Sequence, residues 1–274
     1  MSTIRIALVI VALIVATSYW TIPVALRQLG LHQHYDIPAF DLASKRALVV
    51  TTSHGVLGET GKVTGVFGSE LTVPYYAFVD AGLEVNIASI KGGAIPVEPR
   101  SMSWPLATDD DYRFRKDAVA MGKLMNSMAV SDVQADEYDV IYMAGGWGAA
   151  YDLAQSQELA ELVSAANAQG AILGAICHGV LGLVSAKDVD GTPLMEGRRA
   201  TGVTDKQVKE LNIDITPKHP ETELRAVGAD FEANTGFRDF FATHVVVDAN
   251  IVTGQNQNSG YETSHRILEL LAAK

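Results

Sequence analysis

Cysteine is almost absent from this chain: its 274 residues include one, Cys177. A single thiol cannot form an internal disulfide, and it leaves out the paired cysteines of the common zinc sites. The seven histidines are scattered and show no ligand spacing. We therefore expect no metal site.

Positive charge is also scarce. Lysine and arginine total 21 against 32 aspartates and glutamates, which gives a formal net charge of −11. Without a basic stripe to contact phosphates, we expect no nucleic-acid partner. Internal repeats and low-complexity tracts are missing as well, while hydrophobic residues make up 48% of the chain. Length and composition thus favour one large domain with an appendage.

The appendage is the N-terminus, where the 21 residues from Ile6 to Leu26 carry no charge. That length suffices to cross a hydrocarbon core of about 30 Å. We predict an uncleaved transmembrane anchor over residues 1–27, and a tether over residues 28–45. Arg5 and the terminal amine would hold the short tail inside, so the catalytic domain is expected outside the cytoplasm.

Two alternatives to an anchor stay open. In the first, residues 1–27 are a signal peptide cut near Ala16-Thr17-Ser18, which would export a soluble protein. In the second, the apolar segment is a buried helix of the globular domain.

Beyond the tether, apolar runs of strand length alternate with helical stretches. We predict strands at residues 46–52, 84–89, 139–143, 171–176, 198–203, 243–248 and 251–253, and helices at 69–80, 113–128, 149–170 and 262–272. This alternation predicts an α/β fold over residues 46–274, a doubly wound and mostly parallel sheet sandwiched by helices. Ligands of such sheets bind beyond the carboxyl ends of the strands, where His54, Gly145-Gly146 and Cys177 fall.

Cys177 follows a short apolar run and precedes residues that suit the first turns of a helix. It would then occupy a strand-to-helix corner, and the small residues Ala175 and Gly179 beside it are those that a nucleophile elbow needs. A helix N-terminus favours a thiolate, so we expect the pKa of Cys177 to lie well below about 8.5. A buried structural cysteine is the alternative.

Four motifs together resemble the ThiJ/PfpI superfamily, most closely its glyoxalase III and stress-chaperone branch, which is also described as class I glutamine amidotransferase-like. They are Lys62 to Glu70 entering a helix, Ala144 to Gly148 with Asp152, Ala175 to Gly179, and Ala200 to Asp205. The likeness runs from about residue 46 to the C-terminus. It implies a flavodoxin-like sandwich, an enzyme without a cofactor, and a homodimer, which is the family habit.

Carried over by motif, the resemblance makes Cys177 the nucleophile, His178 its neighbouring base and Glu70 the carboxyl group that hydrogen-bonds the sulfur. Oxyanion donors would be Gly146 and the backbone after Cys177. The full set of expected oxyanion and substrate-binding residues is Gly145, Gly146, Trp147, Gly179 and His54.

Glu70 also stands out without the resemblance. A lone glutamate that opens an apolar helix at the active edge would be desolvated, and its raised pKa would let it move a proton near pH 7. The alternative is an ordinary solvent-facing acid that the helix dipole stabilises.

One position departs from the superfamily, in which an acid well beyond the cysteine orients the histidine. The choices here are Asp205 and Glu210, because Val208 between them cannot serve. We choose Asp205, since it follows the matching Thr-Gly-x-Thr stretch, and keep Glu210 as the alternative.

The tripeptide His219-Pro220-Glu221 offers a further hypothesis, because true class I amidotransferases complete their triad with a His-Pro-Glu. Pro220 is better explained as the first residue of a helix, with Glu221 in its first turn.

The leading functional hypothesis is a cofactor-free conversion of methylglyoxal, or a related 2-oxoaldehyde, to a 2-hydroxy acid through a Cys177 hemithioacetal. A 2-oxoaldehyde is then the expected small-molecule partner. The rivals are a non-enzymatic stress holdase or a sensor in which Cys177 is oxidised, and an amidotransferase or other amidase-type hydrolase.

Overall fold

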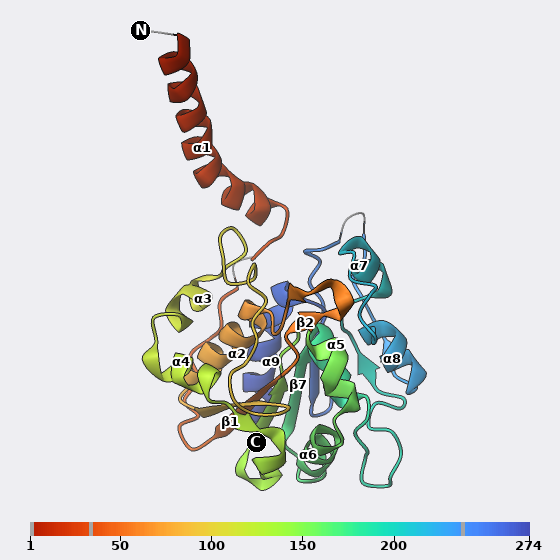
Figure 1. The fold of residues 1–274 in the computed structure, drawn as a ribbon. Coiled ribbons are helices and arrows are strands. Elements are labelled where there is room, and N and C mark those ends of the chain that lie inside the picture. The colour runs from red at the N-terminus through yellow and green to blue at the C-terminus, as the bar shows by residue number, and fades with distance from the viewer. Residues whose placement is uncertain (1–2, 33–34, 237–238) are drawn as a thin grey trace. The chain divides into compact units, whose positions relative to one another are not determined.

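Among the residues that the structure describes (3–32, 35–236 and 239–274), seven strands form a central sheet in the order β10-β11-β7-β6-β1-β4-β5 (Figure 1). The structure is a computed structural model. The strands are β1 (Arg46–Thr51), β4 (Glu84–Ser89), β5 (Met128–Ala129), β6 (Val140–Met143), β7 (Ile172–Ile176), β10 (Val245–Asp248) and β11 (Ile251–Gly254). Neighbours pair parallel except β10 with β11. The predicted, mostly parallel sheet is confirmed.

Helices cover both faces of this sheet (Figure 1). One face carries α2 (Gly68–Asp80), α3 (Asp109–Phe114), α4 (Ala118–Met125) and α9 (Gly260–Ala272), and the other carries α5 (Ala149–Asp152), α6 (Gln157–Ala168) and α8 (Pro220–Ala226). The strand run Leu48-Val49-Val50 is buried on both sides, as a strand between two helical layers must be. Its alternate side chains enter two separate hydrophobic clusters.

Shorter elements lie outside the central sheet. They are the hairpin β2 (Val56–Leu57) and β3 (Lys62–Val63), the pair β8 (Arg199–Ala200) and β9 (Asp230–Phe231), helix α7 (Asp205–Glu210), and the 3-10 turns η1 (Gly58–Thr60), η2 (Val130–Asp132), η3 (Ala135–Glu137), η4 (Leu153–Gln155), η5 (Cys177–Leu183) and η6 (Gln257–Ser259). The strand predicted at 198–203 is therefore wrong in extent and in place: two residues form β8, in a separate parallel pair with β9.

Two predicted helices are each interrupted by a capping side chain. The stretch 113–128 divides because Asp117 leaves helical geometry and accepts hydrogen bonds from the N–H groups of Val119 and Ala120, which starts α4 afresh. The stretch 149–170 divides in the same way at Ser156, which accepts from the N–H of Leu159 and starts α6. Short polar side chains that bond to nearby backbone compete with a continuous helix.

The helix expected from Pro220 is confirmed. Pro220 is the first residue of α8, Glu221 lies in its first turn, and His219 occupies the N-cap. Proline suits this position because its missing N–H would have had no helical partner.

The first 34 residues form a unit separate from Tyr35–Lys274. They contain α1 (Thr3–Gln28). The most apolar 18-residue window of its stretch Ile4–Gln28 has a mean hydropathy of 2.1 and contains no buried residue. By length and composition this helix is able to cross a membrane. Within the predicted 28–45 tether, Ile37, Phe40 and Leu42 pack against the core of the second unit.

Candidate active site

Cys177 sits at a sharp corner where β7 ends and η5 begins. Its φ of 56° lies in the left-handed region, which a side chain other than glycine adopts only under strain. The turn closes because Gly179 has no side chain: a Cβ there would collide with the carbonyl oxygen of Met143, at the end of β6. The corner predicted from the small residues around the thiol is therefore present.

Just after β6, Gly145 lies close to Glu70 and to the backbone of Gly179. A Cβ on Gly145 would stand 2.5 Å from Oε2 of Glu70 and 2.8 Å from the backbone nitrogen of Gly179. Three segments distant in sequence, the first turn of α2, the loop after β6 and the start of η5, thus meet at one point. Glycine is required there because no other residue leaves room for the carboxyl group.

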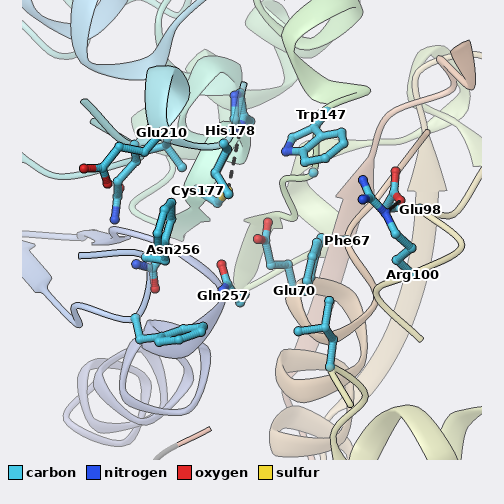
Figure 2. Close-up of a pocket in the computed structure, with 17 residues that line it drawn as sticks. Phe67, Glu70, Glu98, Arg100, Trp147, Cys177, His178, Glu210, Asn256 and Gln257 are labelled. Atoms are coloured by element: carbon cyan, nitrogen blue, oxygen red, sulfur yellow. Dashed lines mark hydrogen bonds and ion pairs between the residues drawn. The ribbon is translucent and has the colours of Figure 1, made fainter. Parts of the chain in front are cut away.

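Next along the chain, Gly146 has a φ of 101° and packs on the loop that leads into α2, where a Cβ would overlap the backbone of Gly65 and Phe67. This fold-back exposes the backbone of Gly146 towards the sulfur of Cys177 and sets Trp147 beside the thiol (Figure 2).

A cavity of about 430 Å³ opens over Cys177. It is lined by Phe67, Glu70, Glu98, Arg100, Leu106, Gly146, Trp147, Cys177, His178, Val203, Gln207, Glu210, Leu211, Phe240, Phe241, Asn256 and Gln257. In Figure 2 the carboxyl group of Glu70 points towards Cys177, and Glu98 with Arg100 lies across the cavity from Glu210 and Asn256. A mostly apolar cleft with a few converging polar groups is the usual form of a small-molecule site.

Glu70 is a buried acid whose surroundings change its chemistry. The residue is 1% exposed, and neither carboxyl oxygen makes a hydrogen bond of normal geometry to a described residue. Burial raises its pKa to about 8, although the Cys177 thiol and the Gly145 backbone act in the opposite direction. Glu70 is therefore protonated below pH 8, and the solvent-facing alternative is wrong.

The expected low pKa of Cys177 is wrong as well. Burial first, and then the charge and hydrogen bonding of Glu70, raise the pKa of the thiol, while the backbone of His178 and of Gly146 lowers it. The prediction assumed an exposed helix N-terminus, but η5 is a short 3-10 turn and the thiol is shielded from water. The two neighbouring acids compete, because two negative charges cannot share a dry site.

His178 is the neutral partner in this cluster. Its Nδ1 lies 3.5 Å from Sγ of Cys177 (Figure 2). Burial, and secondarily the charge of His219, lowers its pKa to about 3. The imidazole is therefore uncharged near neutral pH and is able to accept the thiol proton.

The remaining predicted residues divide between the cavity and its surroundings. Trp147 and Gly146 line the cavity, whereas Gly145 and Gly179 lie behind it as packing glycines. His54 is outside, stacked on Tyr151 with ring centroids 4.0 Å apart.

The two candidates for the third catalytic member also differ in place. Asp205 begins α7 and is engaged with α8, since it accepts a hydrogen bond from Thr222 and its N–H donates to Glu221. Glu210 lines the cavity and pairs with Lys206 at 3.5 Å. Neither Asp205 nor Glu210 forms a hydrogen bond with His178 in the described chain. Nε2 of His178 has no hydrogen-bond partner among the residues that the structure describes.

Sequence reasoning missed several cavity residues. Asn256 and Gln257 follow β11, the parallel neighbour of β7, and the polar run Gln255 to Asn258 after a buried strand was a usable signal. Glu98 and Arg100 come from the long excursion after β4 and carry no sequence signal of their own. Within the described residues, no group of three or more histidines, cysteines or acids is placed to hold a metal ion.

Comparison with known proteins identifies the family of this chain. Residues 63–270 match the DJ-1/PfpI family. The glutathione-independent glyoxalase HSP31 of Saccharomyces cerevisiae is 30% identical over 241 residues, which cover 84% of this chain and 99% of the yeast protein. Glyoxalase 3 of Candida albicans is 27% identical over 232 residues, covering 82% and 97% respectively.

Solved structures show the same fold. The 24 kDa rapid encystment protein of Francisella tularensis aligns with a TM-score of 0.77 and 32% identity, covering 83% of this chain and 99% of that one. Glyoxalase III of Candida albicans aligns with a TM-score of 0.76 at 24% identity, over 83% and 98%. The resemblance seen in the motifs is confirmed, and the chain belongs to the DJ-1/PfpI family.

Proposed function

We propose that this protein converts methylglyoxal, or a related 2-oxoaldehyde, to a 2-hydroxy acid without a cofactor. The observation that carries the proposal is the pairing of a buried thiol, Cys177, with a buried carboxyl group of raised pKa, Glu70, in the wall of one cavity. The glyoxalase names of relatives that align with most of the chain support it.

The first step is addition of the thiol to the aldehyde. As Sγ of Cys177 bonds to the aldehyde carbon, the neutral His178 accepts the thiol proton and then returns it to the new oxyanion, which gives a hemithioacetal. The proposed oxyanion donors are the backbone N–H groups of Gly146 and His178; in support, the backbone of both residues lowers the pKa of the Cys177 thiol.

The second step moves a proton between carbons. The carboxylate form of Glu70 removes the hydrogen of the former aldehyde carbon as a proton, and the electron pair passes to the neighbouring carbonyl oxygen, which gives an enediolate. Glu70 then delivers that proton to the neighbouring carbon, while the hydroxyl proton of the former aldehyde carbon passes to the neighbouring oxygen. This leaves a thioester on Cys177 beside the new 2-hydroxyl group. Water cleaves the thioester, releases the 2-hydroxy acid and restores the thiol. A pKa of about 8 makes Glu70 a stronger base than an exposed glutamate.

The test is turnover by the purified full chain against methylglyoxal, glyoxal and phenylglyoxal, with a chelator present and no glutathione. We expect lactate, glycolate and mandelate as the products. Consumption of none of the three aldehydes above the uncatalysed rate would refute the proposal.

Asp205 is proposed as a positioning residue. It links α7 to α8, whose N-cap His219 acts on the pKa of His178. Asp205→Asn should lower kcat about tenfold, the usual scale for an outer hydrogen-bond partner, and less than a change at Cys177 or Glu70. Glu210→Gln is the matched comparison, measured with the same aldehydes. A larger loss in Glu210→Gln would transfer the role to Glu210.

For the N-terminus we propose an uncleaved anchor over residues 1–27, with the domain 46–274 outside the cytoplasm. The support is the length and apolar composition of α1 and the charge of Arg5 before it. The protein should stay with membranes after a carbonate wash, and protease added to spheroplasts should digest the domain. Release by carbonate, or a mature N-terminus near Tyr19, would favour a cleaved signal instead; protease protection of embedded protein would reverse the orientation.

A further inference from the structure

We infer that one wall of the Cys177 cavity is a hydroxyl-binding subsite made of Glu98, Arg100 and Trp147, and that the substrate is a 2-oxoaldehyde with hydroxyl groups on its distal carbons. The inference rests on the proposed function, because it names the substrate class of the same site. None of the three side chains takes part in the two chemical steps above.

Glu98 is a buried carboxylate in which one oxygen accepts a hydrogen bond and the other accepts none from a described residue. Its side chain is 6% exposed, and its Oε1 accepts a hydrogen bond from Nε of Arg100 at 3.1 Å. Its Oε2 is buried and has no hydrogen-bond partner in the part of the chain that the structure describes. A buried acceptor without a hydrogen-bond donor destabilises the protein. A ligand hydroxyl that donates a hydrogen bond to Oε2 would remove this cost and would therefore bind more tightly.

The backbone around Glu98 is held by the segment that carries Glu70. The N–H of Glu98 donates to the carbonyl of Val66, and its carbonyl accepts from Oγ of Ser101. The same Ser101 hydroxyl accepts from the N–H of Gly68, the first residue of α2. Glu98 and Glu70 are thus fixed to one rigid framework, which is the condition for a preorganised subsite.

Arg100 and Trp147 supply the complementary contacts. The guanidinium carbon of Arg100 lies 5.4 Å from the centroid of the Trp147 ring, and Figure 2 shows both residues at the cavity with Glu98 next to Arg100. Apart from its Nε, the arginine donates no hydrogen bond to Glu98, and its side chain is 72% exposed. Its outer N–H groups are therefore available to a ligand oxygen.

The charges select a neutral ligand. A cation at Oε2 of Glu98 would be repelled by the guanidinium of Arg100, and an anion at Arg100 would be repelled by the carboxylate of Glu98. A hydroxyl group both donates and accepts, so neighbouring hydroxyls satisfy Glu98 and Arg100 together while the carbon chain contacts the indole of Trp147.

The cavity has room for such a chain. At about 430 Å³ it falls in the range of roughly 300–1,000 Å³ that holds much larger ligands than a three-carbon aldehyde. Trp147 directly follows Gly146, whose backbone faces the sulfur, so the subsite begins one residue from the reacting centre.

The experiment compares two six-carbon aldehydes of matched length, 3-deoxyglucosone, which carries distal hydroxyls, and 2-oxohexanal, which carries none. With the full-length wild-type enzyme we expect kcat/KM to favour 3-deoxyglucosone by at least about tenfold, the scale of hydrogen bonds to charged groups. Glu98→Gln and Arg100→Gln should each remove most of that preference, by raising the KM for 3-deoxyglucosone.

Glu232→Gln is the control, because it breaks an arginine pair with Arg199 outside the cavity. Binding is also measured directly: calorimetry compares the affinity for 3-deoxyglucosone of the Cys177→Ala variant with that of the double variant Cys177→Ala and Glu98→Gln. Equal binding in both variants, or an unchanged preference in Glu98→Gln and Arg100→Gln, would overturn the subsite. If no aldehyde is turned over the proposed function fails, and the calorimetry still decides whether the subsite exists.

Discussion

Cys177→Ser should reduce 2-oxoaldehyde turnover at least about a thousandfold, the scale on which enzymes lose activity when their nucleophile is replaced. A hydroxyl is a far weaker nucleophile than a thiol, and it holds its proton far more tightly, so His178 would not activate serine as it is proposed to activate the thiol. The measurement is kcat with methylglyoxal for the full-length chain, alongside thermal unfolding. Serine keeps the shape of the side chain, so the unfolding temperature should change little.

The same variant separates the rival functions. A stress holdase would protect an unfolding client equally well with serine at position 177, whereas a redox sensor would lose its peroxide response because no other cysteine is present. Wild-type turnover in Cys177→Ser would remove the thiol from the mechanism.

Glu70→Gln should lower kcat by about 10²- to 10⁴-fold, because an amide keeps the shape of the carboxyl group but cannot carry a proton. In the wild type the rate should rise with pH up to about 8, as Glu70 loses its proton and becomes a base. That rise should be missing in the variant. Glu262→Gln makes the same change in the first turn of α9, and it should behave like the wild type.

Glu70→Gln should make the Cys177 thiol easier to alkylate, although it lowers turnover. The charge and hydrogen bonding of Glu70 raise the pKa of Cys177, so Glu70→Gln should bring the midpoint of iodoacetamide labelling to a lower pH even as turnover is lost. The lone cysteine makes the label specific to this site. Full turnover, or an unmoved labelling midpoint, would separate Glu70 from the sulfur.

The free energy of unfolding should also depend on pH through Glu70. A carboxyl group whose pKa is raised from 4.5 to about 8 by folding stabilises the protein fully below pH 4.5, and this contribution is lost as the pH rises to 8. At about 1.4 kcal/mol per pKa unit, the wild type should lose on the order of 4 to 5 kcal/mol over that interval relative to Glu70→Gln. Denaturant unfolding of both proteins at pH 5 and pH 8.5 measures the difference.

Much of the fold was predictable because its buried strands are continuous apolar runs. Arg46–Thr51 and Glu84–Ser89 were expected almost to the residue, since parallel strands between helical layers have no polar face to confuse the pattern. The helix interruptions at Asp117 and Ser156 were missed because an N-cap looks like an ordinary surface residue until its partner amides are placed.

The protonation states of the candidate site residues were harder to predict from the sequence than the identity of those residues. Cys177, His178 and Glu70 could be chosen from motifs, but their protonation depends on burial, which no local pattern reports. His219 is another such case: its tripeptide suggested amidotransferase chemistry, while the structure makes it the N-cap of α8 and an electrostatic neighbour of His178. Glu98 could not be found at all, because its proposed role depends on a buried oxygen without a hydrogen-bond partner in the described part of the chain, in a residue that lines the cavity.

The left-handed backbone at Cys177 sets stability against activity at one position. Holding a side chain at a φ of 56° costs roughly 1–3 kcal/mol, and glycine would relieve it without disturbing the turn. A search for more thermostable variants would therefore favour Cys177→Gly, the substitution that removes the nucleophile of the proposed reaction. Under the proposed function, the reaction and not the fold is what requires cysteine at this position.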